Sequence, residues 1–133
     1  MKITRAADYA MRLLVKLAML GEESQSRVLS EEIEVPFNHL NKLTQLLSRR
    51  GFIATRKGKG GGLRLARDPK SISLMEVIEA VEGPIVLSNC LFQRQNCRFS
   101  AKCKVRKTLC AVQKQMKAML AERTIHDMMI ERG

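Results

Sequence analysis

Residues 36–65 read PFNHLNKLTQLLSRRGFIATRKGKGGGLRL, and this stretch contains the clearest helix and hairpin signals of the chain. Pro36 suits the first turn of a helix, because its missing N–H is not needed there. Leucines then recur at helical spacing until Gly51, which predicts a helix that ends at that glycine. Two short runs, 52–55 and 63–65, flank a loop that holds four glycines. We therefore expect a helix followed at once by a β-hairpin wing.

A second, shorter helix is predicted just upstream of this one, over residues 27–32. The two helices are joined by only a few residues, and the second carries Asn, His, Lys and Gln on its outer side, which is typical of a helix-turn-helix. The turn has Glu34 at a position where glycine is usual. Further upstream, Thr4 is predicted to cap a helix that ends at Gly21.

Downstream of the hairpin, Ser73 is predicted to cap a helix that runs through Val81. Residues 85–102 are irregular in pattern, and the strongest helix of the chain follows over 104–121. Its apolar residues step by four and three, as in a heptad seam: Val105, Leu109, Val112, Met116 and Met119. Such a seam on a long terminal helix favours pairing with a second copy, although packing on its own domain is the alternative. A last short helix is expected over 125–130, capped by Thr124.

These elements predict a mainly α fold with a small β-hairpin. We expect a winged helix-turn-helix domain over residues 1–84 and a cysteine-rich loop over 85–103. A dimerisation helix with a short terminal helix would then occupy residues 104–133.

The charge of the chain points to a polyanionic partner. The 133 residues carry a net charge of +11, from 24 basic and 13 acidic residues. Between Arg49 and Arg67 there is no acid, and basic residues surround the glycine-rich loop. This favours nucleic acid over a membrane surface, which an amphipathic basic helix would suit better. No signal peptide or membrane-spanning stretch is visible, so we expect a cytoplasmic protein.

Four cysteines, Cys90, Cys97, Cys103 and Cys110, lie in a basic stretch near the C-terminus. None of them forms the close pair that zinc knuckles use, so an iron–sulfur cluster or a cluster-free thiol sensor fits the spacing better. Cys110 lies seven residues beyond Cys103, about 10 Å along a helix, which favours an ordinary helical cysteine there. With two histidines and few acids near the cysteines, no acid–base pair suggests an enzyme.

Several motifs resemble the Rrf-two superfamily of bacterial regulators. They are the opening 1–4, residues 8–10, the KGKGGGL wing at 57–63 and the three cysteines at 90, 97 and 103. The resemblance covers nearly the whole chain. It implies a homodimeric winged-helix transcription factor with one iron–sulfur cluster per subunit, whose state controls operator binding.

Among the branches of that family, the residues resemble the NsrR type of nitric oxide sensor most. There, three cysteines are joined by an aspartate from the partner's first helix, which corresponds to Asp8, and Arg12 matches a residue near the cluster. The IscR type uses a histidine three residues after the last cysteine ligand, where this chain has Arg106. By itself Asp8 would be an ordinary first-turn acid. The Cys90–Cys97 spacing and the extra Cys110 depart from the pattern and leave iron, redox state or oxygen open as effectors.

The resemblance also implies how DNA would be bound. The helix at 36–50 would enter the major groove, and the wing would meet the flanking minor groove or backbone. The expected base-edge contacts are Asn38, His39, Asn41 and Lys42, and the expected wing contacts are Arg56, Lys57 and Lys59. A cluster between Asp8 of the partner subunit and the cysteine loop would set the spacing of the two recognition helices.

We therefore expect a repressor that senses nitric oxide, redox state or iron status through an iron–sulfur cluster. A 4Fe–4S cluster is favoured and a 2Fe–2S cluster is the alternative. Two other functions stay open. One is an IscR-like regulator of cluster supply, and the other is a cluster-free regulator that responds to a metabolite or to thiol oxidation.

Overall fold

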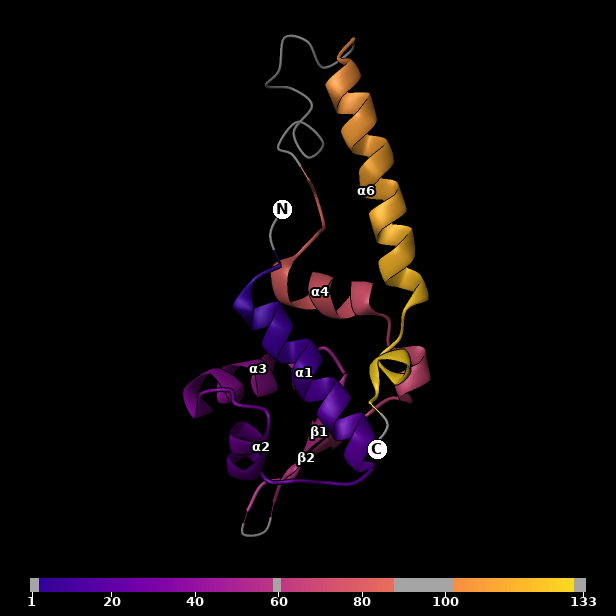
Figure 1. Ribbon diagram of the computed structural model, residues 1–133. Coiled ribbons are helices and arrows are strands. Elements are labelled where there is room, and N and C mark those ends of the chain that lie inside the picture. The colour runs from indigo at the N-terminus through magenta and orange to yellow at the C-terminus, as the bar shows by residue number, and fades with distance from the viewer. Residues whose placement is uncertain (1–2, 59–60, 88–101, 131–133) are drawn as a thin grey trace.

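The computed structural model describes residues 3–58, 61–87 and 102–130. Figure 1 shows a body made of the first four helices and a hairpin, from which one long helix extends. The elements in chain order are α1 (Arg5–Leu20), α2 (Ser26–Glu32), α3 (Phe37–Arg49), β1 (Ile53–Thr55), β2 (Leu63–Leu65), η1 (Pro69–Ser71), α4 (Leu74–Glu82), α6 (Lys104–Glu122) and η3 (His126–Met128). The predicted fold class, a mainly helical winged helix with a small hairpin, is confirmed.

Helix α1 begins and ends where its sequence signals predict. The Thr4 hydroxyl accepts a hydrogen bond from the Ala7 N–H at 3.3 Å, and Gly21 ends the helix in the left-handed conformation at φ 65°. Its apolar side is fully buried at Leu13 and Leu14. Because α1 packs against α3, α4 and β2, it lies at the centre of the body.

The core draws buried side chains from every α-helix of the body and from both strands, and α1 contributes the most. Leu29 of α2 and Leu40 and Leu47 of α3 are fully buried, as is Val77 of α4. The helix-turn-helix pair α2–α3 is thus fastened to the rest of the body by leucines on its inner side. Its polar side remains free to face solvent.

The wing is an antiparallel hairpin in which Ile53 lies opposite Leu65. The predicted first strand begins one residue late, because the Phe52 N–H still closes the end of α3 on the Leu47 carbonyl at 3.0 Å. A third segment joins the sheet at Ser24, which exchanges two backbone hydrogen bonds with Leu63 at 2.9 and 2.7 Å. Gly62 lies so close that a Cβ there would meet the Ser24 carbonyl oxygen at 2.6 Å.

Helix α4 starts with a capping box. The Ser73 hydroxyl accepts from the Glu76 N–H, and the Glu76 carboxylate accepts from the Ser73 N–H. The helix continues one residue beyond the predicted end, to Glu82, and Gly83 follows at φ 83°. Local capping signals therefore locate this helix almost completely.

The chain after α6 returns to the body. Ile125 is fully buried, and its N–H donates to the Ile72 carbonyl at 2.9 Å. The predicted helix over 125–130 is wrong: only a short 3-10 turn forms, and Met129 is already extended. The reason is that Thr124 pairs with Ser73 as in a sheet, so the backbone is committed to a neighbour before it can form a helix. The predicted Thr124 cap is present, since its hydroxyl accepts from the Asp127 N–H.

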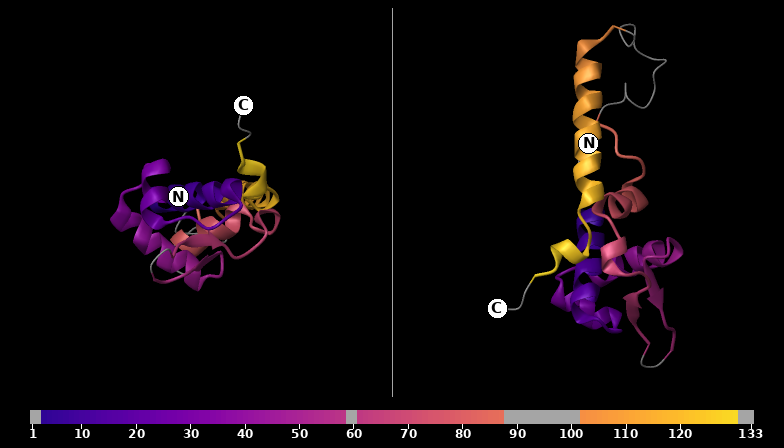
Figure 2. Two further views of the ribbon diagram at one scale, coloured as in Figure 1. Left: turned by 90° about the horizontal axis from the view of Figure 1, so that it is seen from below. Right: turned by 90° about the vertical axis from the view of Figure 1, so that its right-hand side faces the viewer.

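Helix α6 leans on the body with one side only. Its Lys117 ammonium lies 3.7 Å from the Glu79 carboxylate of α4, and the Gln113 side chain accepts from the Leu87 N–H at 2.9 Å. Its other end extends away from the body in Figure 1 and in the right-hand view of Figure 2. No described helix is both long and apolar enough to cross a bilayer.

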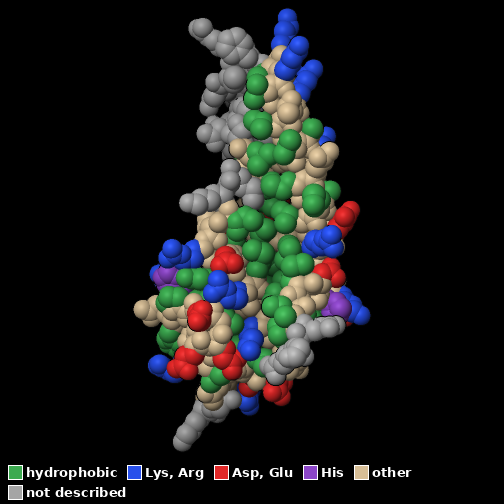
Figure 3. Space-filling view, in the orientation of Figure 1, with side chains coloured by type: hydrophobic (Ala, Val, Ile, Leu, Met, Phe, Trp, Pro, Cys, Tyr) green, Lys and Arg blue, Asp and Glu red, His purple; other side chains and the backbone are tan. Residues whose placement is uncertain are grey.

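The apolar residues of α6 divide into two sets. Leu109 and Met116 are half-buried, whereas Val105, Val112 and Met119 are 65%, 48% and 65% exposed. Figure 3 shows the hydrophobic side chains as a line along α6 that continues onto the body. One chain alone therefore covers only part of the predicted seam.

Candidate nucleic-acid interface and metal-ligand residues

Helix α3 presents a continuous polar face to solvent. Asn38, Lys42, Gln45 and Arg49 are exposed, and Asn41 is half-buried beside them. Their spacing of three and four residues puts them on one side of the helix, opposite Leu40 and Leu47. Three predicted base contacts, Asn38, Asn41 and Lys42, are therefore brought together. Gln45 and Arg49 lie on the same face but were not among the predicted base contacts, although the same periodicity includes them.

His39 lies on a different side of α3. Its ring is 6.0 Å from the ring of Tyr9, centroid to centroid, at an interplanar angle of 58°. Tyr9 belongs to α1, so the imidazole leans toward the neighbouring helix, although it remains exposed. The predicted group of four base contacts is thus split into three residues on one face and one at its edge.

The turn between α2 and α3 has an unusual backbone. Glu34 adopts φ 56°, a left-handed conformation that glycine accommodates more easily than residues with a Cβ. The turn is closed by the Val35 N–H, which donates to the Ser30 carbonyl at 3.0 Å. The turn therefore has a left-handed conformation that would suit glycine, although this chain has Glu34 there.

Arg12 connects α1 to this turn. Its Nη1 donates to the Ile33 carbonyl at 2.8 Å, and its Nη2 lies 2.8 Å from the Asp8 carboxylate. The same guanidinium lies over the Tyr9 ring at 5.5 Å. The side chain of Asp8 is 55% exposed, so its second oxygen has access to solvent. Asp8 and Arg12 thus form one unit that touches the helix-turn-helix directly.

The wing is fastened at its base by Arg56. Its Nε and Nη2 donate to one oxygen of Glu23 at 3.1 and 2.7 Å. The hydrogen bond to Glu23, followed by the charge of that carboxylate, raises the pKa of Arg56 above its ordinary value. Arg56, predicted as a DNA contact, therefore also has a structural role. Lys57 is exposed, and Lys59 lies outside the described residues.

Between α3 and the wing lies a polar depression of about 350 Å³, lined among others by Asn41, Gln45 and Arg56. The Thr44 hydroxyl also lines it, is buried, and has no hydrogen-bond partner among the described atoms. Gly58, Gly61 and Gly62 of the wing also line the depression. A Cβ at Gly61 would collide with the Arg56 carbonyl oxygen, so the backbone there is packed too closely for a side chain. A polar, glycine-walled surface between a recognition helix and a wing suits a DNA backbone.

Of the three predicted cysteine ligands, Cys103 is described. It is the N-cap of α6, and its Sγ accepts a hydrogen bond from the Arg106 N–H at 3.5 Å. A helix N-terminus favours a negative charge, as a thiolate ligand carries. Cys90 and Cys97 lie outside the described residues, and Cys110 is half-buried two turns along α6.

Asp8 and Cys103 of one chain are far from each other. Helix α6 has 19 residues, which gives it a length of about 28 Å. Cys103 caps the end of α6 that points away from the body in Figure 1, whereas Asp8 is in the first turn of α1, within the body. Within the described part of the chain, no three His, Cys, Asp or Glu side chains are close enough to hold a metal ion. A site that used both residues would have to combine two subunits.

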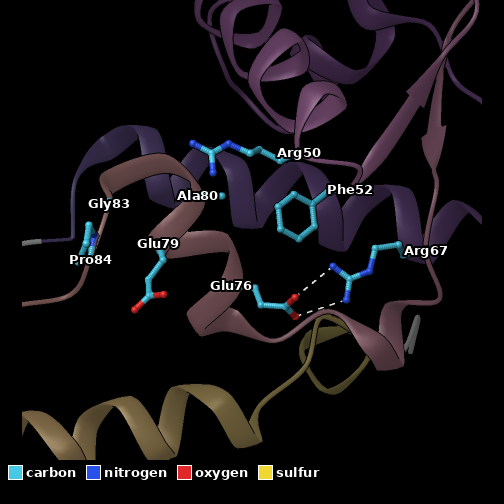
Figure 4. A pocket seen from close by; sticks show the side chains of 8 residues that line it. All are labelled: Arg50, Phe52, Arg67, Glu76, Glu79, Ala80, Gly83 and Pro84. Carbon is cyan, nitrogen blue, oxygen red and sulfur yellow. Dashed lines mark hydrogen bonds and ion pairs between the residues drawn. The ribbon is translucent and has the colours of Figure 1, made fainter.

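A separate cavity of about 520 Å³ lies between α4 and the residues that flank the hairpin (Figure 4). Its charged residues are largely paired: Arg67 lies 3.1 Å from Glu76, stacks over Phe52 and donates to the Ser71 carbonyl. Partial burial acts to raise the pKa of Glu76, but hydrogen bonds from Ser73 and Arg67 outweigh it and hold that pKa below its ordinary value. We interpret this cavity as part of the contact between the hairpin and α4, in which the Arg67–Glu76 pair joins the two elements.

Comparisons with known proteins agree with this geometry. The Rrf2 family model, described as an iron-dependent transcriptional regulator, matches residues 3–131. The transcriptional regulator NsrR of Shouchella clausii is 31% identical over 133 residues, which cover 98% of this chain and 89% of that protein.

Two solved structures share the fold. CymR, the global cysteine regulator of B. subtilis, matches with a TM-score of 0.78 and 18% identity over 96% of this chain and 95% of its own. IscR of T. potens matches with a TM-score of 0.76 and 19% identity over 100% of this chain and 94% of its own. At these identities the likeness concerns the fold alone.

Proposed function

This chain belongs to the Rrf2 family of DNA-binding transcriptional regulators, and from that premise we propose that it senses nitric oxide through an iron–sulfur cluster. The proposed ligands are Cys90, Cys97, Cys103 and Asp8 of the partner subunit. The name NsrR of its relatives and the iron-dependent description of the family support this choice. A protein that binds an operator must reach the DNA in the cytoplasm, so the proposal includes a cytoplasmic location. It also includes a regulatory role without enzymatic activity.

The described donors suit such a group. Cys103 offers a thiolate at a helix N-terminus, and Asp8 offers an exposed carboxylate at the start of another helix. Thiolates with one harder ligand are compatible with iron–sulfur clusters. Because Asp8 is in the first turn of α1 and Cys103 is at the outer end of α6, a ligand set drawn from two subunits is the arrangement that fits.

The observation that carries the proposal is the double contact of Arg12. One guanidinium meets both the Asp8 carboxylate and the Ile33 carbonyl, each at 2.8 Å. Any change in the charge or position of Asp8 therefore alters the group that supports the turn before α3. A bound cluster would supply the centre that reacts with nitric oxide, and Asp8 and Arg12 would connect that site to the DNA-binding helix.

The DNA side of the proposal uses the polar face of α3 and the wing. Asn38, Asn41 and Lys42 would read base edges, with His39 at the edge of that surface. Arg56, Lys57 and Lys59 would contact the flanking backbone or minor groove. Homodimerisation through the exposed residues of α6 would present two such faces to the two halves of an operator.

The test is an anaerobic absorption spectrum with iron and sulfide analysis, recorded before and after nitric oxide, in parallel with DNA binding. We expect a broad visible band, about four irons per subunit, and a change in DNA affinity when nitric oxide bleaches the band. Cys97→Ala should abolish the band, whereas the matched variant Cys110→Ala should keep it.

Other outcomes identify the alternatives. About two irons with slow bleaching would indicate a 2Fe–2S regulator of cluster supply, similar to IscR. A colourless, iron-free protein that binds DNA would indicate a regulator that responds to a metabolite or to thiol oxidation. Either result contradicts nitric oxide sensing through a 4Fe–4S cluster.

The proposed connection from Asp8 through Arg12 to the turn before α3 has its own test. Arg12→Lys keeps a positive charge near Asp8 but lacks the planar fork that reaches two partners. We expect it to retain the visible band while the change in DNA affinity on bleaching shrinks. An unchanged response would show that Arg12 does not connect the two sites.

A further inference from the structure

A cavity of about 380 Å³ lies where α1, α3 and α4 meet. Leu43 and Leu46 of α3 and Val81 of α4 supply apolar walls, and Tyr9 of α1 lines the same space. Its volume is at the lower end of the range of small-molecule sites, which are typically apolar with a few polar groups at defined positions. Neither the winged-helix fold nor the proposed cluster site uses this space.

The charged groups at the cavity have one sign. Arg5 of α1 and Lys42 of α3 line it, and no acid is among the lining residues. Neither cation forms an ion pair with another residue of the described ranges, in contrast to Lys16, Arg67 and Lys117, which do. The acid next to Val81, Glu82, is engaged with the Thr4 hydroxyl. Two uncompensated cations therefore face an apolar cavity.

His39 adds a hydrogen-bonding group to the same rim. Its contact with the Tyr9 ring turns it toward the cavity and away from the polar face of α3. This explains why His39, alone among the four predicted base contacts, does not lie on the polar face of α3. A bare phosphate would leave the leucine and valine walls without a partner, whereas an anion with an apolar body would satisfy both parts of the cavity.

We propose that this cavity binds a small monocarboxylate with an apolar body and that its occupancy weakens DNA binding. The carboxylate would lie between Arg5 and Lys42, and the apolar body would contact Leu43, Leu46 and Val81. Lys42 then has its charge neutralised on the face that meets DNA. The effect on DNA rests on the proposed function, but binding of the carboxylate does not.

Direct binding is tested by titrating the purified full chain with sodium octanoate in a calorimeter. Octanol and octylamine serve as the neutral and cationic probes of equal chain length. We expect saturable binding of octanoate and at least tenfold weaker binding of both other probes. Equal binding of all three would show nonspecific apolar contact and overturn the proposal, as would the absence of octanoate binding.

Two variants locate the site. Arg5→Gln should weaken octanoate binding on the order of tenfold, because it removes a charge-assisted hydrogen bond, whereas Lys70→Gln, an exposed cation elsewhere, should leave it unchanged. Ala6→Phe adds a ring at the exposed rim of the cavity and should abolish binding without disturbing the core. Unchanged binding in both Arg5→Gln and Ala6→Phe would exclude this cavity.

The effect of octanoate binding on DNA binding is tested by measuring the affinity for a random-sequence DNA duplex at several salt concentrations. On DNA without an operator, Lys42 has no specific base to read, and its charge contributes as one phosphate contact. Saturating octanoate should therefore reduce the slope of log affinity against log salt concentration by about 0.9. The slope in Ala6→Phe should not respond. A chain that binds octanoate but no DNA would contradict the DNA-binding function and leave the ligand site in place. An unchanged slope at saturation would contradict the coupling.

Discussion

The body of the molecule and helix α6 differ in how complete they are within one chain. In the body, most large apolar residues of α1 to α4 and of the hairpin are buried or half-buried, and many are fully buried. In helix α6, Leu109 and Met116 are half-buried. Val105, Val112 and Met119, which follow one another at intervals of seven residues, are exposed. The body, whose core includes Ile125 from the segment after α6, is therefore nearly complete within one chain. Helix α6, in contrast, has an apolar side that one chain leaves uncovered.

Placing a charge on the exposed apolar side of α6 should have the largest effect, because it should weaken dimerisation. Val112→Asp would bury an unpaired carboxylate from each copy in a dimer, at about 2 kcal/mol each, and so raise the dimer dissociation constant on the order of a thousandfold. Sedimentation at several protein concentrations measures it. Lys114→Asp, exposed and off the seam, is the matched control. A Val112→Asp protein that stays dimeric would show that this side of α6 is not the interface.

The base of α6 should behave as part of the body. Ile125→Ala removes a fully buried side chain and should lower the free energy of unfolding by about 2–5 kcal/mol. The same substitution at Ile130, which is 73% exposed, should change it by less than about 0.5 kcal/mol. Urea unfolding at one fixed protein concentration gives both values. Equal effects would mean that the return of the chain to the body contributes little.

Within the body, the turn before α3 should be open to improvement. Glu34→Gly removes the Cβ from a residue at φ 56° and should raise the free energy of unfolding by about 1 kcal/mol. Glu31→Gly, in the last turn of α2, should lower it by about 0.5–1 kcal/mol. Thermal or urea unfolding distinguishes the two signs. Destabilisation by Glu34→Gly would mean that its side chain contributes more than the strained backbone costs.

The smallest effect should appear at the joint between hairpin and α4, and it depends on pH. The folded pKa of Glu76 is below its ordinary value, so the unfolded chain takes up the proton first as pH falls. The stability that ionised Glu76 provides is fully present above about pH 4.3 and is lost as pH falls through the lower folded pKa. The difference in unfolding free energy between the native protein and Glu76→Gln should therefore close in acid.

The partner in this joint supplies the control. In an Arg67→Gln background the same Glu76→Gln change should matter less at pH 7, because one source of the pKa shift is gone. A difference between native protein and Glu76→Gln that persists unchanged to low pH would contradict the assignment of this effect to the ionised carboxylate.

Elements that depend on neighbours in sequence were predicted closely. Thr4, Gly21 and Ser73 locate the ends of α1 and the start of α4, since capping and helix termination use groups within about one turn. The leucine periodicity located α3 in the same way. The same reasoning failed at residues 125–130, where pairing between Thr124 and Ser73 overrides a local helical pattern.

The candidate sites divide along the same line. Residue spacing and composition were enough to predict the polar face of α3, the basic wing and the capped helices, because periodicity and local capping depend on residues close in the chain. The packing of separate elements was needed to show that His39 lies against Tyr9, that Arg56 is held by Glu23, and that Arg12 joins Asp8 to the helix-turn-helix. It also decided which half of the α6 seam stays exposed. These contacts depend on how separate helices pack, and no local pattern encodes the distance between side chains from different elements.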